Sequence, residues 1–573
     1  MRIKHFFGLA VIAAMTASCS SNNDLVNGGN GSGENESGAS YASFSINLPT
    51  TRGTRADNPE FNQGTDNEYD VNDVTLLVFK KGTDATSEGA YTFVESVDLG
   101  SMAPWTDSSE GGVTTHSKIT AKLTQVNKSG NYYALILLNN GSGANAKVSL
   151  PTAGDKYSVW NNNSNNATAK FATTDKGFYM ANAPLFKNNS VTTLVAIDQD
   201  KIYPTEAQAS ANEAAADIYV ERGLAKVTLS TTTGAAKTVT DGTYKDDKVA
   251  IKNWALDVTN KKTFPIHNVD GLENDFDAIW KNEAATEASG PSTQRFVDNN
   301  PLTTAKRVYW GVDPNYKNNE LCKEDADGTT AREADFTYVK KKEDLTDGLD
   351  KVQYCLENTF NLANMKQGQT TRVIFKAKYT PNGFTENANF YKIGKNVQLW
   401  KESDLIQHIT AAVTNVVASA TDANTTITLA GSDNDLTKAG NYSLKASNIT
   451  VDGYTLQDAD VTAINNKLGL SEGNGISTYE SGNSYYIARI KHFGDDLTPW
   501  SSGEYGSDNL KYLGRYGMLR NNWYELTVSS VSGPGYPDIP EVKPNTPDDE
   551  DDKYINVSVK ILDWAKRSQS VDL

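Results

Sequence analysis

The sequence has few of the residues on which most catalytic and metal sites depend. Among 573 residues there are only 5 His and 3 Cys, and the histidines are not spaced as zinc ligands. The patterns typical of phosphate-binding loops, dinucleotide-binding turns and nucleophile elbows do not occur. We therefore expect no metal ion, no cofactor and no enzymatic activity. A secreted enzyme is the weakest of the alternatives that the sequence leaves open.

Positive charge is also scarce. Lys and Arg number 54 against 71 Asp and Glu, which gives a formal net charge of -17. A nucleic-acid partner is excluded because its phosphates would be repelled by such a surface. Self-repulsion of this kind is typical of a secreted or surface protein that stays soluble.

Long apolar runs are missing, apart from a short one near the N-terminus. Residues 1–19 start with basic residues, continue through an apolar stretch and place Cys19 directly after small residues. This pattern predicts a lipoprotein signal peptide whose Cys19 carries the acyl chains, such as palmitate. A secretory signal without a lipid is the alternative. Since no other segment is apolar enough to cross a bilayer, the lipid would be the precursor's only tie to the outer membrane.

Short alternating runs between Gly, Asn, Asp and Ser clusters make up most of the remaining sequence. They predict a mainly β chain of two β-sandwich domains, transthyretin-like or Greek-key in type. We expect the N-terminal domain over residues 56–215 and the C-terminal domain over residues 216–532, with an insertion around 400–480. Helical composition occurs over 204–217, and a short helix is predicted over 458–468 inside the insertion.

A strand with one apolar face precedes the first predicted domain. Its apolar residues alternate with polar ones and are Ala42, Phe44, Ile46 and Leu48. This removable strand belongs to a propeptide over residues 20–55, which also holds a polar tether and a stretch without apolar residues. A trypsin-like, Arg-specific protease needs an accessible arginine in an extended chain. We predict cleavage between Arg55 and Ala56, with Arg52 as the alternative site; unprocessed, solvated arginines are the other interpretation.

The chain ends with a linker and one further strand. Residues 533–552 are rich in Pro and acidic residues, so we expect an extended linker held away from the body. Residues 553–573 form the predicted donor strand, whose apolar residues are Ile555, Val557, Val559, Ile561, Trp564, Val571 and Leu573. Such a strand needs a sheet edge. Its own domain is one possibility, but a domain that closes on itself needs no long charged spacer, so we favour addition to another molecule.

The two terminal strands share the same alternation, which allows one groove to hold them in turn. Cleavage would remove the lipid, the tether and the first strand together. The groove would then accept residues 553–573 of a neighbouring copy. Because donor and acceptor are different surfaces of one protein, the contact is heterologous and produces an open filament.

Several segments resemble the Bacteroidales-type (type V) fimbrillins, especially shaft subunits of the minor fimbria. They are the lipobox ending at Cys19, the Arg55–Ala56 junction, YVERGLAKVTL, YCLENTF, RYGMLRNNWYELTVSSVSGPG and VSVKILDWAKRSQSVDL. The resemblance implies two β-sandwich domains, lipoprotein export, Arg-specific processing and strand exchange between identical or related pilin subunits. It also implies an extracellular fimbrium that adheres to host or bacterial surface ligands and acts in biofilms. Anchor subunits lack the donor strand, so its presence implies a shaft or accessory subunit.

Two questions stay open in the sequence. A surface glycan-binding lipoprotein is the alternative function, since exposed aromatic residues such as Trp500, Tyr505 and Tyr512 stack on sugars in other proteins. Cys322 and Cys355 either form a disulfide in an oxidising compartment or stay buried as free thiols.

Overall fold

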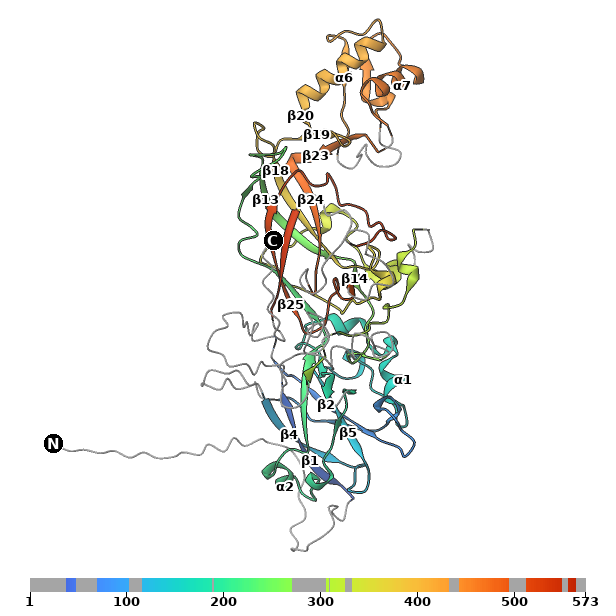
Figure 1. Cartoon of the computed structure of the whole chain (residues 1–573), viewed down its shortest axis with the longest axis vertical. Coiled ribbons are helices and arrows are strands. Elements are labelled where there is room, and N and C mark those ends of the chain that lie inside the picture. The colour runs from blue at the N-terminus through green and yellow to red at the C-terminus, as the bar shows by residue number, and fades with distance from the viewer. Residues whose placement is uncertain are drawn as a thin grey trace, which may run out of the picture.

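The computed structural model describes residues 38–47, 68, 70–102, 116–187, 190–270, 306–308, 310–324, 332–431, 443–471, 473–493, 512–548 and 555–562. Figure 1 shows an elongated molecule, with the N-terminal region at one end and a small helical part at the other. The described chain is mainly β with few helices, so the predicted class is confirmed. The division into two transthyretin-like sandwiches stays a prediction. None of the described helices combines the length and the apolar character that a membrane span requires.

The N-terminal region contains one eight-stranded sheet, in the order β3-β2-β5-β6-β10-β1-β4 with β9 paired to β5. Its strands are β1 (Ser40–Asn47), β2 (Val74–Lys80), β3 (Thr92–Asp98), β4 (His116–Leu123), β5 (Tyr132–Leu138), β6 (Met180–Asn182), β9 (Val195–Ala196) and β10 (Ala216–Arg222). The first half of β10 pairs with β1 and the second half with β6. This switch of partners folds the sheet over a core to which β1, β2, β4, β5 and β10 all contribute.

Strand β5 has apolar residues on both faces, as its continuous apolar run predicts. Ile136 and Leu138 lie in the core shared with β1. Leu135 and Leu137 lie in a second core, which also contains Trp523 from the C-terminal region. The second core therefore joins the two halves of the molecule.

The C-terminal region packs two four-stranded sheets face to face. The first has the order β17-β11-β25-β26 and the second β12-β13-β18-β24. Their strands are β11 (Ala225–Leu229), β12 (Lys237–Thr238), β13 (Lys248–Asp257), β17 (Gln353–Cys355), β18 (Arg372–Thr380), β24 (Asn483–Arg489), β25 (Trp523–Val531) and β26 (Ile555–Leu562). Trp254, Phe375 and Tyr524 are fully buried between the sheets.

A small subdomain with its own apolar core extends from this region, at the top of Figure 1. Its elements are β19 (Phe390–Ile393), β20 (Leu399–Lys401), α6 (Glu402–Val416), β21 (Thr425–Ile427), β22 (Ile449–Val451), α7 (Asp458–Lys467) and β23 (Ile476–Tyr479). The short helix predicted over 458–468 is confirmed as α7. The longer helix α6 was missed, although Leu405, Ile409 and Val413 recur at helical spacing and are fully buried.

The remaining short elements cover the sheets and connect them. They are α1 (Tyr157–Asn161), α2 (Glu206–Ala211), β7 (Leu185–Lys187), β8 (Ser190–Thr192), β14 (Thr259–Asn260), β15 (Lys306–Arg307) and β16 (Phe336–Thr337). Helix α2 lies within the stretch of helical composition over 204–217.

The chain passes from one half of the molecule to the other between β10 and β11. Strand β10 completes the N-terminal sheet, and the chain enters the C-terminal sheet only with β11. Gly223 lies between them, where a Cβ atom would come within 2.6 Å of the Phe171 ring. The division into domains at residue 215 stays a prediction; β10 and β11 form one nearly continuous strand pattern, in which a single glycine marks the change of sheet.

Residues 533–548 pack on the C-terminal region, which corrects the prediction of an extended linker over 533–552 for this part; residues 549–552 lie outside the described residues. Tyr536 forms a β-bridge with Tyr485. Asp548 is completely buried, and its carboxylate accepts a hydrogen bond from Thr370 at 2.9 Å. Proline fixes an extended backbone and keeps its carbonyl acceptor. A proline-rich segment can therefore dock along a surface instead of standing away from it.

Candidate functional site

Strand β1 is enclosed by neighbours on both of its edges. All its residues from Ser40 to Asn47 pair antiparallel with β4, and Phe44 to Asn47 also pair in parallel with β10. On the β10 side the pairing begins earlier through Tyr41, whose N–H donates to Tyr203 O at 2.7 Å. The predicted removable strand is therefore a central strand of its sheet.

The inward side chains of β1 form part of the N-terminal core. Ala42, Phe44 and Ile46 have exposed fractions of 0%, as their alternation predicts. Burial of Phe44 and Ile46 contributes roughly 3–6 kcal/mol to the stability of the folded chain. Leu48, the fourth residue of the predicted strand, lies outside the described residues.

The outer side of β1 is covered near its start by residues 203–215, here called the cover segment, which contains α2. Ala215 N–H donates to Ser43 O at 2.7 Å, and α2 packs against β1 and β4. Ser43 is only 1% exposed, and its hydroxyl has no hydrogen-bond partner among the described residues. Removal of β1 would thus leave a slot between β4 and β10. The slot would have the apolar N-terminal core as its floor, two unpaired strand edges, and the cover segment above the position of Ser43.

The C-terminal strand β26 lies at the edge of its own chain's sheet, antiparallel to β25. Val557 and Val559 pack against the C-terminal core. The full chain therefore has the intramolecular arrangement, which is the alternative to donation that the sequence allows. The side chains of Ile555 and Ile561 are not described, and Trp564, Val571 and Leu573 lie outside the described residues.

The predicted lipidation and cleavage residues, Cys19, Arg52, Arg55 and Ala56, also lie outside the described residues. The first described residue after them is Glu68, which is 1% exposed at the junction of the two halves.

The Glu68 carboxylate accepts hydrogen bonds from Lys226 Nζ at 2.7 Å and from the Tyr354 hydroxyl at 2.8 Å. Its carbonyl oxygen accepts two more from the Arg222 guanidinium. Trp523 covers the Lys226 ammonium, 3.7 Å from the ring centre. Burial is the main cause that lowers the pKa of Lys226, and the Glu68 contact opposes it. Sequence reasoning missed Glu68, because nothing in its polar neighbourhood distinguishes it.

A second buried charge cluster lies at the same junction. His267 Nδ1 is 2.8 Å from Glu221 Oε1, and its Nε2 is 3.8 Å from Glu357 Oε1. Arg520 Nε donates to the other oxygen of Glu357 at 3.2 Å. Because these groups come from both halves, the junction is fixed by directional contacts as well as by the apolar core.

The structure settles the state of the two cysteines and places one of the three candidate sugar-stacking aromatic residues. Cys322 and Cys355 are buried free thiols and form no disulfide. Burial raises the pKa of Cys322 to about 11 and that of Cys355 to about 12, so both thiols are unreactive near neutral pH. Tyr512 is 1% exposed and packs in a core, so it is no sugar platform. Trp500 and Tyr505 lie outside the described residues.

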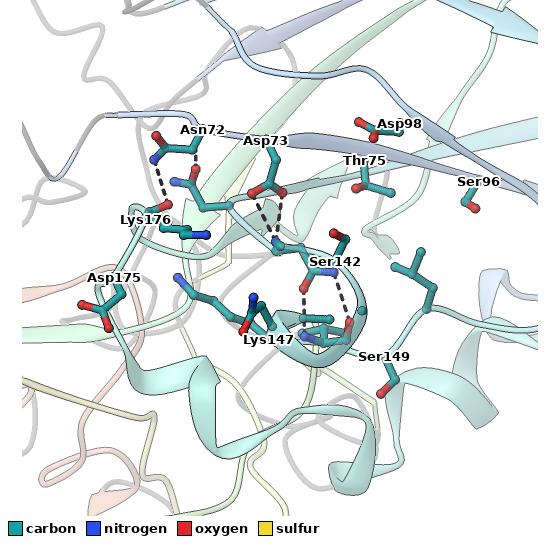
Figure 2. A pocket seen from close by; sticks show the side chains of 18 residues that line it. Asn72, Asp73, Thr75, Ser96, Asp98, Ser142, Lys147, Ser149, Asp175 and Lys176 are labelled. Carbon is teal, nitrogen blue, oxygen red and sulfur yellow. Dashed lines mark hydrogen bonds between the residues drawn. The ribbon is translucent and has the colours of Figure 1, made fainter.

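A pocket of about 600 Å³ opens beside the start of β2 (Figure 2). The loop over residues 139–143 forms one wall and has positive φ at Asn139, Gly141 and Gly143. The Asn139 amide holds this loop by accepting from Asn72 N–H at 2.7 Å. The wall is therefore fixed without a ligand.

Lys147 lies at the base of the same pocket. Its ammonium donates to Gly177 O at 2.6 Å. Burial lowers the pKa of Lys147 to about 8, against the opposing fields of Asp73 and Asp175. At neutral pH the pocket therefore holds a charged ammonium among carboxylate, amide and hydroxyl groups.

Residues 477–570, which contain β24, β25 and β26, match a family model described as the C-terminal part of fimbrillin, the major fimbrial subunit protein type IV. Two solved structures from Parabacteroides distasonis, each described as a "putative cell adhesion protein", are each 12% identical to this chain. Their TM-scores are 0.35 and 0.33. The alignments cover 93% and 92% of this chain, respectively, and 99% of each solved chain. The tip fimbrial protein of Porphyromonas gingivalis, with a C-terminal truncation, is 10% identical over 91% of this chain and 100% of its own, with a TM-score of 0.29. Comparison with curated proteins gave no match. The C-terminal part of this chain is thus similar to the fimbrillins, and the resemblance that the sequence indicates is confirmed.

Proposed function

We propose that the chain is a structural subunit of a surface pilus that polymerises by strand exchange. The observation that carries this proposal is the position of β1. It is a central strand of its sheet, yet it is joined to the next described residue, Glu68, only through a segment that contains Arg52 and Arg55. A cut in that segment leaves β1 held by non-covalent contacts alone. The fimbrillin match of residues 477–570 supports a structural rather than an enzymatic role.

The precursor reaches the outer membrane as a lipoprotein acylated at Cys19. Cleavage between Arg55 and Ala56 by an Arg-specific protease separates lipid, tether and β1 from the body. The processed subunit then joins an extracellular fimbrium, where it takes part in adhesion and biofilm formation. The family description of the matched C-terminal region favours this course over permanent membrane attachment.

Strand β26 is the donor in this proposal. Among the described strands it pairs with β25 alone, at the edge of the sheet. In the slot of a second copy it would pair with β4 on one side and with β10 on the other, and apolar side chains would meet the core that β1 leaves. A strand that moves from an edge to a central position gains a second set of backbone hydrogen bonds, which favours the polymer once the slot is empty.

Trypsin treatment of the purified precursor tests this function. We expect a new N-terminus at Ala56 and filaments in negative-stain electron micrographs. The double variant Arg52→Ala/Arg55→Ala should stay uncleaved in this segment and monomeric, whereas Lys128→Ala, at an exposed lysine elsewhere, should polymerise normally. Filaments from the double variant without a cut before residue 68 would contradict strand exchange by processing.

A second candidate function, saccharide binding, is favoured by the pocket in Figure 2, which combines polar groups with apolar surface. The hydroxyl groups of Thr75, Ser96 and Ser142 line it and have no hydrogen-bond partner among the described residues. Leu150 at the rim is 41% exposed and offers an apolar contact. A screen of the processed protein on a glycan array would test this function. A ligand of this pocket should bind the double variant Ser96→Ala/Ser142→Ala at least about tenfold more weakly than wild type. Equal binding by wild type and variant would exclude the site.

A further inference from the structure

The cover segment buries one outward position of β1 and leaves the others accessible. Ser43 is 1% exposed beneath residues 203–215, whereas Tyr41 and Ser45 on the same side are half-buried. Ala209 of α2 is fully buried, and Ser210 holds the segment down through a 2.9 Å hydrogen bond to Thr120 of β4. Space above Ser43 therefore suffices for a small side chain and for little else.

The strand beside β26 is only partly covered on its outer side. Ser558 pairs with Thr527 of β25, and Thr527 and Glu525 are half-exposed while Ser529 and Ser530 are exposed. We therefore expect the full chain to tolerate a large side chain at position 558. The same side chain would meet the cover segment if β26 entered the slot of β1.

We infer that Ser558 sets the register of strand exchange by taking the place of Ser43 under the cover segment of a second copy. This inference rests on the proposed function. Val557 and Val559, which flank Ser558, then replace Ala42 and Phe44. This holds whether β26 runs in the same direction as β1 or in the opposite one. Two valines fill about the same volume as one alanine and one phenylalanine, and volume-conserving exchanges are tolerated best in cores.

The next inward position agrees with this register. Ile46 is replaced by an isoleucine in both directions, Ile561 in one and Ile555 in the other. A shift by two residues would put Asn556 or Lys560 under the cover segment, and both are larger than serine. A shift by one would turn the apolar residues away from the core. One register therefore places apolar residues against the N-terminal core and also a small residue beneath the cover segment.

Polymerisation of three trypsin-processed variants tests the register. We expect Ser558→Ala to give as much polymer as wild type by light scattering and electron microscopy. Ser558→Leu should give about tenfold less, because overpacking beneath a fixed segment weakens the joint. In the proposed register position 560 takes the place of Ser45 or Tyr41, which are half-buried beside the cover segment, so Lys560→Leu should stay within about twofold of wild type. Equal thermal unfolding of the three precursors would show that each is folded.

Equal polymer from Ser558→Leu and Ser558→Ala would overturn the register while leaving strand exchange intact. No polymer from processed wild type would overturn both. A separate experiment uses the unprocessed precursor and needs no polymer. Ser43→Leu should lower the melting temperature of the precursor, whereas Ser45→Leu should not. Equal melting temperatures of these two variants would overturn the steric role of the cover segment.

Discussion

Glu68 shows how one side chain ties the two halves of the molecule together. It lies between the predicted cleavage site and β2, and Lys226, Tyr354 and Arg222 bind it in a fully buried site. A buried ion pair is weak evidence for net stabilisation, but removal of one partner leaves the other charge buried and unpaired. The junction therefore depends on Glu68 being present.

We predict that Glu68→Gln lowers the free energy of unfolding by about 3–5 kcal/mol, because the Lys226 ammonium loses its counter-charge in a buried site. Urea unfolding monitored by tryptophan fluorescence measures the change. Glu343→Gln, at an exposed carboxylate, should change it by less than about 0.5 kcal/mol. Equal unfolding of the two variants would show that the contact at the junction is dispensable.

Glu88 is a second single residue of interest, because its contribution to the stability of the folded chain depends on pH. Burial raises its pKa from the ordinary 4.5 to about 7, although Thr193 and Leu194 donate backbone hydrogen bonds to the carboxylate. The folded chain thus keeps this proton up to about pH 7, while the unfolded chain releases it near pH 4.5. Between these values the unfolded state binds fewer protons, so this group's contribution to stability falls as pH rises.

We therefore predict that Glu88→Gln reduces the loss of stability between pH 4.5 and pH 7, by at most about 3 kcal/mol. Urea unfolding at several pH values compares the variant with wild type and with Glu206→Gln, an exposed carboxylate on α2. Parallel pH profiles for all three proteins would mean that Glu88 is ionised throughout this range.

At the scale of elements, β1 and β26 have similar sequences and different positions. Strand β1 is central and β26 is at an edge. Removal of β1 from its sheet therefore requires more free energy than detachment of β26. In the proposed function, only proteolysis makes the removal of β1 irreversible. Stability of the precursor and of the polymer should then depend on different strands.

We predict that Phe44→Ala lowers the unfolding free energy of the precursor by about 3–5 kcal/mol, because it leaves a cavity in the N-terminal core. Ser45→Ala, on the half-buried outer side, should have little effect. Polymers made from both variants should melt like wild-type polymer, since they no longer contain β1. A lower melting temperature for the Phe44→Ala polymer would mean that β1 stays in place after cleavage.

At the scale of the whole molecule, the helical subdomain joins the body through the β19–β23 pair, and Leu399 of β20 also packs on the core between the two C-terminal sheets. Ile393 of β19 pairs with Ile476 of β23, and Gly394 N–H donates to Gly475 O at 2.7 Å. Its core is separate from the core between the two C-terminal sheets. The chain thus leaves and re-enters the body through one hydrogen-bonded pair of strands.

We predict that residues 395–474 can be replaced by an Asn-Gly turn with a change of less than about 5 °C in the main melting transition, because a two-residue turn closes such a hairpin. Circular dichroism measures this transition. Removal of α6 alone should instead destabilise the subdomain, since Leu405, Ile409 and Val413 leave its core. Collapse of the whole chain on replacing 395–474 would show that the body depends on the subdomain.

Local patterns in the sequence were sufficient for much of this fold. The alternation in β1 identified its buried residues, the continuous apolar run of β5 identified a strand covered on both faces, and α7 was found by its composition. Helix α6 was not predicted, because its β-branched residues, such as Ile409 and Val413, favour a strand as well. The linker prediction was wrong over residues 533–548, because a segment rich in Pro and acidic residues can also dock, as the Tyr536–Tyr485 bridge and the buried Asp548 show.

The sequence by itself determined which face of each strand is apolar, and with it the likeness of the two terminal strands. Only the tertiary structure decided that β1 lies between β4 and β10, that β26 returns to β25, and that one point above the slot is covered. The physical reason is that period-two alternation fixes which way side chains point, while backbone hydrogen bonds are the same for every residue and do not specify a partner strand.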